Sequence, residues 1–240
     1  SVIVSEGVRV YGGSLESDSP LSLQARALDV RHGRLVTGTT SSTGLTVNLT
    51  GVGPKYSSYL GFAGRIWARS SFVKLRAANH ALILSNGYIY SATSTSVEAQ
   101  SISMSSGGFG CNNVGCVVNM TTLVGNLSAG GGFIMADGLK RDGDDGRVVL
   151  RAAAGEVALH SRLRVIAETV DVYAATSVTV DSDSEVIGGT VQMDADGSIV
   201  VSGTVNTNSA NGDSLYNGSG ITGSGRTSTT ASQYYGGSGG

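Results

Sequence analysis

The sequence predicts an all-β fold in which short strands coil into a β-helix, and three observations support this prediction. Apolar pairs separated by one residue, such as Val148/Leu150 and Val157/Leu159, return about every seven residues over long stretches. Alternation with period two is typical of a strand that is buried on one face. A small residue often follows each pair, which suits a tight corner, and no stretch keeps the 3.6-residue period of a helix through these corners.

The composition excludes several classes of protein. The 240 residues include 36 glycines but only 14% charged residues, and the net charge is −2. This charge provides no field that would attract nucleic acid or an anionic membrane surface, so neither is an expected partner. The hydrophobic content of 40% is too high for a disordered chain. No segment approaches the ~18 consecutive apolar residues of a membrane span.

The clearest repeat covers residues 147–203. Each unit is shorter than the repeats of solenoids that contain helices, and it matches one strand on one face of a β-helix. The alternation places the apolar side chains in the core between the faces. The predicted core positions are Val148, Leu150, Val157, Leu159, Leu163, Val165, Val170, Val172, Val178 and Val180.

The rhythm divides the chain into five segments. Residues 65–104 form a first β-helix run and residues 147–203 a second one. Residues 1–64 form an N-terminal β region that is interrupted by a Ser/Thr/Gly-rich lobe at residues 36–64, and residues 105–146 form an insertion with a Cys loop and many glycines. We expect both interruptions to be side lobes. Residues 204–240 form a Gly/Ser/Thr-rich tail that we expect to lie on a neighbouring subunit, because it cannot bury enough of its own surface to become ordered alone.

A count of strands bears on the number of chains. A single-chain β-helix uses three strands, or roughly 20–25 residues, per coil, so residues 147–203 would supply only two to three coils. Solenoids need about three stacked repeats to bury a continuous core. If three chains wind around one axis, each supplies one face per layer, and the same run makes seven or eight layers. We therefore expect an intertwined trimer of identical or homologous chains.

On this rhythm, residues 65–104 and 147–203 resemble the triple-stranded β-helix shafts of phage tail spikes and type VI secretion spike proteins, and the extracellular domains of sarcoglycans. The resemblance implies a β-helix fold and the association of chains. The chain lacks the C-terminal cysteine cluster of sarcoglycans and a His-x-His spike tip. We therefore transfer neither a specific partner nor a puncturing activity. The alternative fold is a β-sandwich that polymerises by donating a strand from residues 2–10.

The cysteines and glycosylation sequons bear on location. Four residues lie between Cys111 and Cys116, and glycines flank them, which allows either a small disulfide loop or two free buried thiols, and we predict the disulfide. No second Cys or His pair completes a zinc site. Together with four N-glycosylation sequons, the cysteines predict an extracellular or surface location. The sequons begin at Asn48, Asn119, Asn126 and Asn217.

No motif predicts catalysis. The three histidines lack a local catalytic pattern, and we expect them to be structural or exposed. The G-x-S-x-G pattern at residues 236–240 and the G-x-G-x-x-G pattern at residues 218–223 lack the strand and helix that each requires. Asp142, Asp144 and Asp145 fit an Asp/Gly turn between strands. The alternative is that their carboxylates bind Ca²⁺. We predict no enzymatic activity and no other cofactor.

Two sets of side chains are predicted to face outward. Four arginines alternate with core positions, and we expect them to pair with Glu156 and Glu168 or to contact a neighbouring subunit or an acidic glycan. Tyr88 and Tyr90 face outward if Ile89 faces inward, and exposed tyrosines suit protein interfaces or glycan binding. The four arginines are Arg147, Arg151, Arg162 and Arg164.

The sequence thus favours a structural subunit of an extracellular fibre, appendage or surface assembly, built by multichain β-helix association. The alternative is a glycan-binding or glycan-cleaving adhesin or tail-spike module. A binding module would gather its exposed tyrosines and acidic residues in one groove, whereas a fibre subunit would spread them around the shaft.

Overall fold

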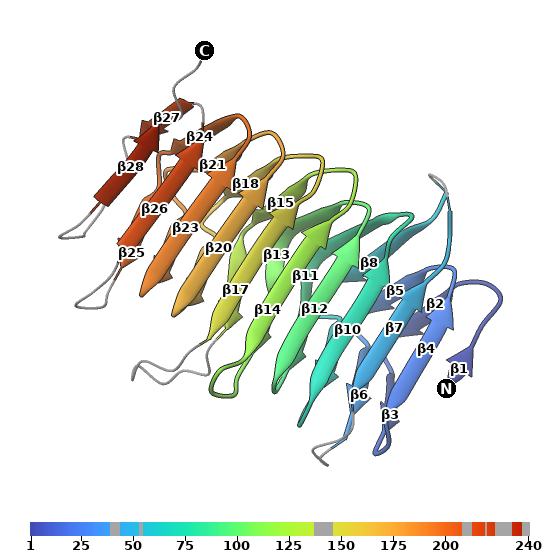
Figure 1. Cartoon of the computed structure of the whole chain (residues 1–240). Helices are drawn as coiled ribbons and strands as arrows, with labels where there is room; N and C mark the ends of the chain where they lie inside the picture. The colour runs from blue at the N-terminus through green and yellow to red at the C-terminus, as the bar shows by residue number, and fades with distance from the viewer. Residues whose placement is uncertain are drawn as a thin grey trace.

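The computed structural model of the chain is a parallel β-solenoid of about eight turns (Figure 1). It describes residues 1–38, 44–52, 55–136, 146–207, 213–218, 220–223 and 232–236, and side chains as far as Asn206. The described residues form strands and turns only, and none forms a helix long and apolar enough to cross a membrane. The predicted β-helix is confirmed. The β-sandwich alternative is wrong, because strand β1 pairs in parallel with β4 of the same chain instead of donating itself to another.

Each coil supplies one strand to each of three faces. Face 1 contains β1 (Val2–Ile3), β4 (Leu21–Ala25), β7 (Leu45–Leu49), β10 (Phe72–Ala77), β12 (Ser94–Ala99), β14 (Val117–Thr122), β17 (Arg147–Ala152), β20 (Thr169–Ala174), β23 (Thr190–Ala195), β26 (Asp213–Gly218) and β28 (Ser232–Gly236). Face 2 contains β2 (Val8–Tyr11), β5 (Leu28–Arg31), β8 (Ser57–Gly61), the first parts of β11 (Ala81–Ser91) and β13 (Ile102–Cys111), β15 (Leu127–Gly130), β18 (Val157–His160), β21 (Val178–Val180), β24 (Ser198–Val201) and β27 (Gly220–Gly223). Face 3 contains β3 (Ser14–Ser17), β6 (Arg34–Thr37), β9 (Arg65–Ala68), the second parts of β11 and β13, β16 (Gly132–Ala136), β19 (Arg164–Ala167), β22 (Glu185–Gly188) and β25 (Thr204–Thr207).

The spacing of paired strands shows that successive rungs belong to one chain. Leu21 pairs with Leu45, Phe72 with Ser94 and Thr169 with Thr190, which are separations of 24, 22 and 21 residues. These separations match the coil length expected of a single-chain β-helix. The expectation that one chain supplies too few coils to form a β-helix core is therefore wrong.

The count failed because the supposed interruptions also coil. Residues 36–64 contain β7 and β8, which pair in register with β4 and β5, so this segment is not a side lobe. Residues 105–146 contain most of β13 together with β14, β15 and β16, and they complete coils in the same way. Within residues 204–240, strands β25 to β28 stack on the preceding coils of the same chain.

The core lies between the three faces and is closed within the chain. All ten predicted core positions of residues 147–203 are fully buried. Full burial of one Val or Leu side chain stabilises the fold by about 1.5–3 kcal/mol. Small inward residues form a row at the end of face 1, where the chain turns into face 2. This row runs through Ala77, Ala99, Thr122, Ala152, Ala174 and Ala195.

The corner between faces 2 and 3 is made by residues in the left-handed region. His32, Asn86, Gly107 and Ser161, which lie at this corner in four different coils, have φ values of 53°, 59°, 103° and 56°. Asn and Gly adopt this region most readily. At Gly107, a Cβ atom would overlap the carbonyl oxygen of Gly87 in the preceding coil, so no other residue fits.

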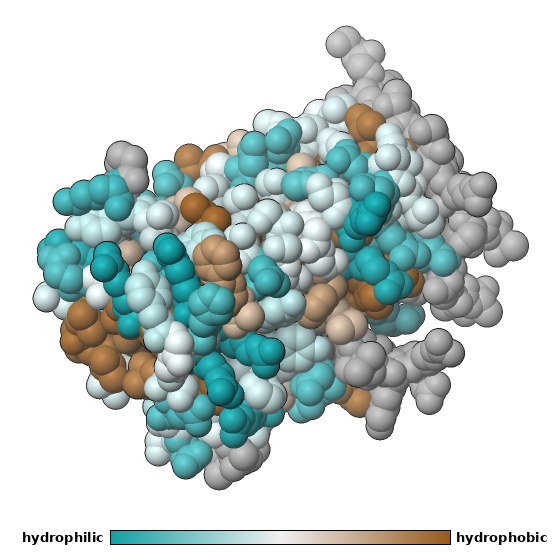
Figure 2. Space-filling view, turned by 180° about the vertical axis from the view of Figure 1, so that it is seen from behind, coloured by the Kyte–Doolittle hydropathy of each residue, from teal (hydrophilic) through white to brown (hydrophobic). Residues whose placement is uncertain are grey.

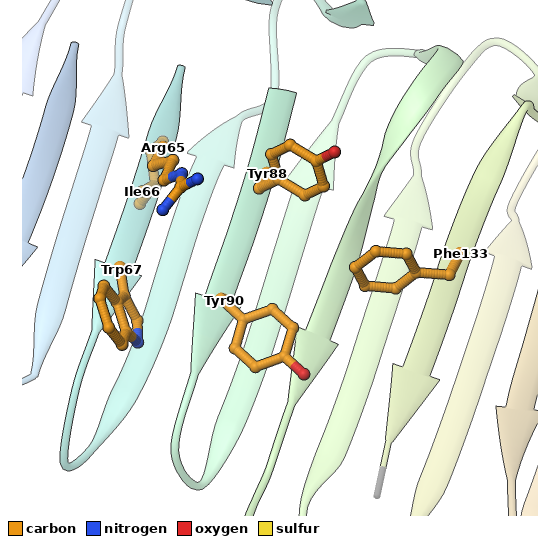
Figure 3. A pocket seen from close by; sticks show the side chains of 6 residues that line it. All are labelled: Arg65, Ile66, Trp67, Tyr88, Tyr90 and Phe133. Atoms are coloured by element: carbon orange, nitrogen blue, oxygen red, sulfur yellow. The ribbon is translucent and has the colours of Figure 1, made fainter. Parts of the chain in front are cut away.

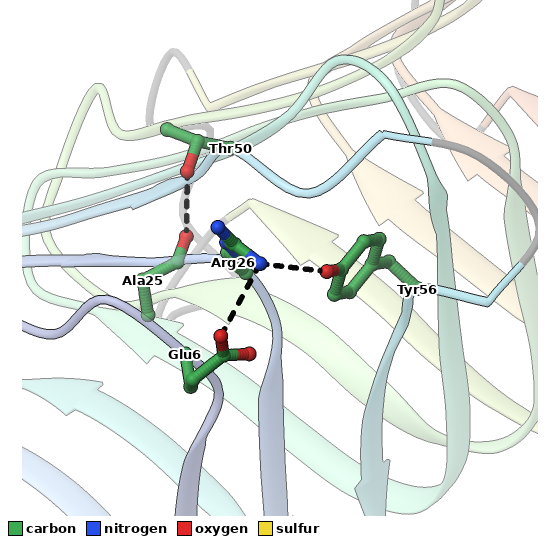
Figure 4. Close-up of polar contacts among 5 residues, drawn as sticks. All are labelled: Glu6, Ala25, Arg26, Thr50 and Tyr56. Atoms are coloured by element: carbon green, nitrogen blue, oxygen red, sulfur yellow. Dashed lines mark hydrogen bonds and ion pairs between the residues drawn. The ribbon is translucent and has the colours of Figure 1, made fainter.

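Polar contacts link coils on the outside. Near the N-terminus, Arg26 Nη1 donates to Glu6 Oε1 at 3.2 Å and to the Tyr56 hydroxyl at 3.1 Å, joining three successive turns (Figure 4). Thr50 Oγ1 donates to the Ala25 carbonyl oxygen at 3.3 Å beside them. The hydrogen bond with Tyr56, followed by the charge of Glu6, raises the pKa of Arg26.

We expect the Gly107→Ala substitution to destabilise the solenoid by clearly more than the ~1–2 kcal/mol cost of a left-handed residue, because the new methyl group meets the Gly87 backbone. Gly115→Ala is the matched control, since Gly115 also has positive φ but open space around it. Urea unfolding followed by circular dichroism measures both losses. Equal losses of stability in the two variants would contradict the close approach of the Gly107 and Gly87 backbones.

Candidate functional site

Face 3 differs from the other two faces in its outward side chains. On face 1, one outward row runs through Thr46, Lys74, Ser96 and Asn119, which are mostly small or polar residues. On face 2, outward positions of the central coils include Ser103, Ser105 and Ser128. Faces 1 and 2 also carry half-buried apolar residues on the outside, such as Val149, Ile83 and Val200, but on face 3 aromatic and aliphatic side chains follow one another over more rungs. Exposed apolar surface of this kind marks binding or association sites.

Two outer rows run along face 3, parallel to the solenoid axis. They alternate with fully buried inward residues such as Ile66, Ile89 and Val165. The first outer row is Ser14, Arg34, Arg65, Tyr88, Gly108, Phe133, Arg164, Glu185 and Thr204. The second outer row is Glu16, Val36, Trp67, Tyr90, Gly110, Met135, Ile166, Ile187 and Asn206.

The centre of face 3 holds an aromatic hollow of about 240 Å³. Its aromatic side chains come from β9, β11 and β16 and project from the outer side of the strands (Figure 3). The ring centroids of Tyr88 and Phe133 lie 6.1 Å apart, and those of Tyr90 and Phe133 lie 6.5 Å apart. The lining residues are Arg65, Ile66, Trp67, Tyr88, Tyr90 and Phe133.

Two glycines of β13 allow the rings to lie close to the sheet. A Cβ atom at Gly108 would lie 2.6 Å from a ring carbon of Phe133. A Cβ atom at Gly110 would overlap the ring of Tyr90. Because β13 lies between β11 and β16, side chains at these positions would displace both rings.

The hollow is chemically apolar, with one charged group at its rim. Arg65 is exposed and makes no ion pair with a described residue. Half-burial raises the pKa of Tyr90, because desolvation disfavours the phenolate. The surface therefore suits an apolar or aromatic group next to an anion, which is the chemistry of a protein interface centre rich in Trp, Tyr and Arg.

A second apolar surface lies at the N-terminal end of the solenoid. Val2 and Ile3 are 38% and 74% exposed, and Val4, Val8 and Leu15 are only partly buried. Figure 2 shows a concentrated hydrophobic patch at this end of the molecule. The patch is the open end of the stacked core.

The histidines lie in three different environments. His80 is buried, with Nδ1 3.1 Å from the Gly51 carbonyl oxygen and Nε2 2.9 Å from Ser58 Oγ. Ser58 Oγ in turn accepts a hydrogen bond from the Leu28 amide at 3.1 Å, so this group holds successive coils together. His32 stacks on Phe62 at a corner, and His160 bonds to neighbouring serines.

The predicted disulfide is confirmed. Cys111 ends β13, Cys116 precedes β14, and both residues are fully buried where face 3 turns into face 1. Asn48 is exposed on the outer side of face 1, and Asn119 lies on the same side, with its amide oxygen 3.2 Å from Thr121 Oγ1. Asn126 Nδ2 donates to Glu156 Oε1 at 3.1 Å.

Other predicted residues fall outside the description. Asp142, Asp144 and Asp145 lie outside the described residues, and so does the side chain of Asn217. In the parts of the chain that the structure does describe, no three His, Cys, Asp or Glu side chains gather as metal ligands would.

The outward arginines have partners one coil further along the chain. Arg147 Nε donates to Asp171 Oδ2 at 2.6 Å, and Arg164 Nε donates to Glu185 Oε2 at 3.1 Å. The expected pairing with Glu156 and Glu168 is therefore wrong for these two arginines. The register places Arg147 and Arg164 beside residues of the next coil, which lie 24 and 21 residues further along the chain. Arg151 and Arg162 are exposed.

Sequence reasoning placed Tyr88 and Tyr90 outward but missed Trp67, Phe133 and the aliphatic end of the second outer row. The available signal was two consecutive apolar residues where alternation should have placed one, as in Val165-Ile166 and Val186-Ile187. Comparison of the chain with protein-family models, with curated proteins and with solved structures gave no match.

We expect replacement of both cysteines by alanine to lower the free energy of unfolding by about 2 kcal/mol, because the disulfide closes only a short loop. Circular dichroism should still show a β-fold, since the coils on either side pair through the backbone. Thiol labelling of denatured, unreduced wild-type protein should find no free thiol. Two labelled thiols per chain, as in the reduced control, would contradict the disulfide.

Proposed function

We propose that this chain is a non-enzymatic structural subunit of an extracellular fibre, appendage or surface assembly, which forms by association with identical or homologous chains. The observation that carries the proposal is the pair of outer rows on face 3. A solenoid that closes its own core needs no apolar side chains on the outside, yet half-buried Trp67, Met135, Ile166 and Ile187 line one face. Burial of such a face against another chain would remove this surface from water.

The closed core changes the mode of association that we propose. Intertwined chains would share rungs, but here each rung pairs with the next rung of the same chain. Chains would therefore pack side by side as finished solenoids. The buried disulfide supports an oxidising, extracellular location, because disulfides persist there. The exposed Asn48 sequon is compatible with glycosylation in that location.

Association predicts reversible, concentration-dependent growth in mass. Sedimentation velocity from about 1 to 100 µM, a range that covers typical weak interfaces, should show species larger than the 24.3 kDa chain. Electron microscopy of the concentrated sample should show regular particles or filaments. A chain that remains monomeric over the whole range would contradict the proposal.

Glycan binding is the second candidate, and the aromatic hollow favours it, because sugar rings stack on aromatic faces. The side chains that line the hollow include no carboxylate, which favours binding over cleavage of a glycan.

Affinity electrophoresis in gels that contain soluble polysaccharides tests the second candidate. Retardation that is lost in Trp67→Ala but kept in Tyr173→Ala, on face 1, would support it. Equal mobility with and without each polysaccharide would reject it for those glycans.

A further inference from the structure

The two outer rows of face 3 differ between the two ends of the solenoid, and this polarity limits how they can meet a partner. In the first outer row, Arg34 and Arg65 lie toward the N-terminal end, and the ion pair of Arg164 and Glu185 lies toward the C-terminal end. The aromatic residues and the two glycines lie between these ends. The second outer row has no ionisable group other than the Tyr90 phenol from Val36 to Asn206.

We infer that face 3 binds face 3 of a second copy of this chain, with the two solenoids antiparallel and related by a twofold axis that passes between the β13 and β16 rungs. The inference rests on the proposed function, because it names the partner and the geometry of the association. A twofold interface is self-complementary, so every contact occurs twice and the contact closes at two copies; it would supply the paired unit of a larger assembly and not its growth.

The charges match in this arrangement. A twofold axis perpendicular to the solenoids places the first outer row opposite the first outer row of the partner, in reverse order. Arg65 then faces Glu185, and Arg164 faces the ring of Tyr88, where a guanidinium is attracted to the aromatic face. Glu185 would lie between its own Arg164 and the partner's Arg65, and all three groups would lie at the border of the apolar centre.

The apolar residues match as well. In the same register, Phe133 faces Gly108 and Met135 faces Gly110, and the rings of Phe133 and Tyr90 from the same chain cover these glycines, so apolar side chains of the two copies meet at the axis. In the second outer row, Trp67 faces Ile187 and Tyr90 faces Ile166. The aromatic hollow, which lies beside these positions, would then be covered by the partner.

Two other arrangements are less favourable. A parallel dimer would place the first outer row against the second, so that Arg164 would face Ile166 and Glu185 would face Ile187. Burial of charges against apolar side chains carries a desolvation penalty that nothing offsets. A second antiparallel dimer would have its twofold axis through β13 instead of between β13 and β16. Arg65 would then face Arg164 of the partner, and the two guanidinium groups would repel each other.

The size of face 3 fits a dimer of moderate affinity. Strands of four residues and eight coils give a flat footprint of about 500 Å², from spacings of ~3.3 Å along a strand and ~4.8 Å between strands. Specific interfaces bury roughly 800 Å² of accessible surface per partner, and a side-chain surface exceeds its flat footprint. We therefore expect dissociation in the micromolar range.

A charge-exchange experiment with the full chain tests the geometry. The Arg65→Glu substitution sets two carboxylates opposite each other in both copies of the contact, and Glu185→Arg sets two guanidinium groups opposite each other. Each variant alone should dimerise at least about tenfold more weakly than wild type in sedimentation velocity. An equimolar mixture of the two variants should dimerise again, because each contact in the mixed dimer joins one carboxylate to one guanidinium group.

Glu98→Arg is the matched control. Glu98 pairs with Arg76 at 2.7 Å on face 1, as Glu185 pairs with Arg164 on face 3, so its replacement breaks an equivalent ladder pair away from the interface. It should leave dimerisation unchanged, and unfolding curves of all variants show whether the fold is kept.

The outcomes separate the two proposals. The face 3 dimer would be overturned if wild type associates and both charge variants associate equally well, or if the equimolar mixture of variants does not dimerise. In either case the proposal of a structural subunit would remain. Wild type that stays monomeric up to about 100 µM would overturn both.

Discussion

Parallel backbone pairing between successive coils of one chain is the constraint on which the rest of the structure depends. Each strand pairs its amide and carbonyl groups with strands one coil away, which lie between 18 and 31 residues along the chain, so the hydrogen-bond ladder fixes the register of the coils while their lengths vary. A fixed register places equivalent residues above one another. Inward positions then form a continuous core, and outward positions form rows.

Rows explain why the surface chemistry is organised by face. The pair Arg76–Glu98 and the pair Arg164–Glu185 are direct rung neighbours, although more than twenty residues separate their members in sequence. The same rule brings Trp67 beside Tyr90 and places Gly110 next in that row. A substitution at one outward position therefore acts first on the residues about one coil before and after it.

The sequence was sufficient for the strand period, the inward residues and the disulfide, because these depend on local alternation and short spacing. Val148 and Leu150 could be placed in the core from their immediate neighbours. The number of coils that one chain supplies could not be judged correctly, because β7, β8, β15 and β16 lie in Gly-, Ser- and Thr-rich segments whose apolar pairs are sparse. The hollow was missed because Trp67, Tyr88 and Phe133 meet only when the coil register is known.

The most direct test of a coil closed within one chain is a pair of engineered cysteines on neighbouring rungs of face 1. Ser96 and Asn119 are register partners on the outer side of β12 and β14. After oxidation of a Ser96→Cys, Asn119→Cys variant, the account predicts a cross-link within the chain, which runs at monomer size in a denaturing, non-reducing gel. Neighbouring rungs supplied by different chains would instead give covalent dimers and trimers, and that result would contradict the account.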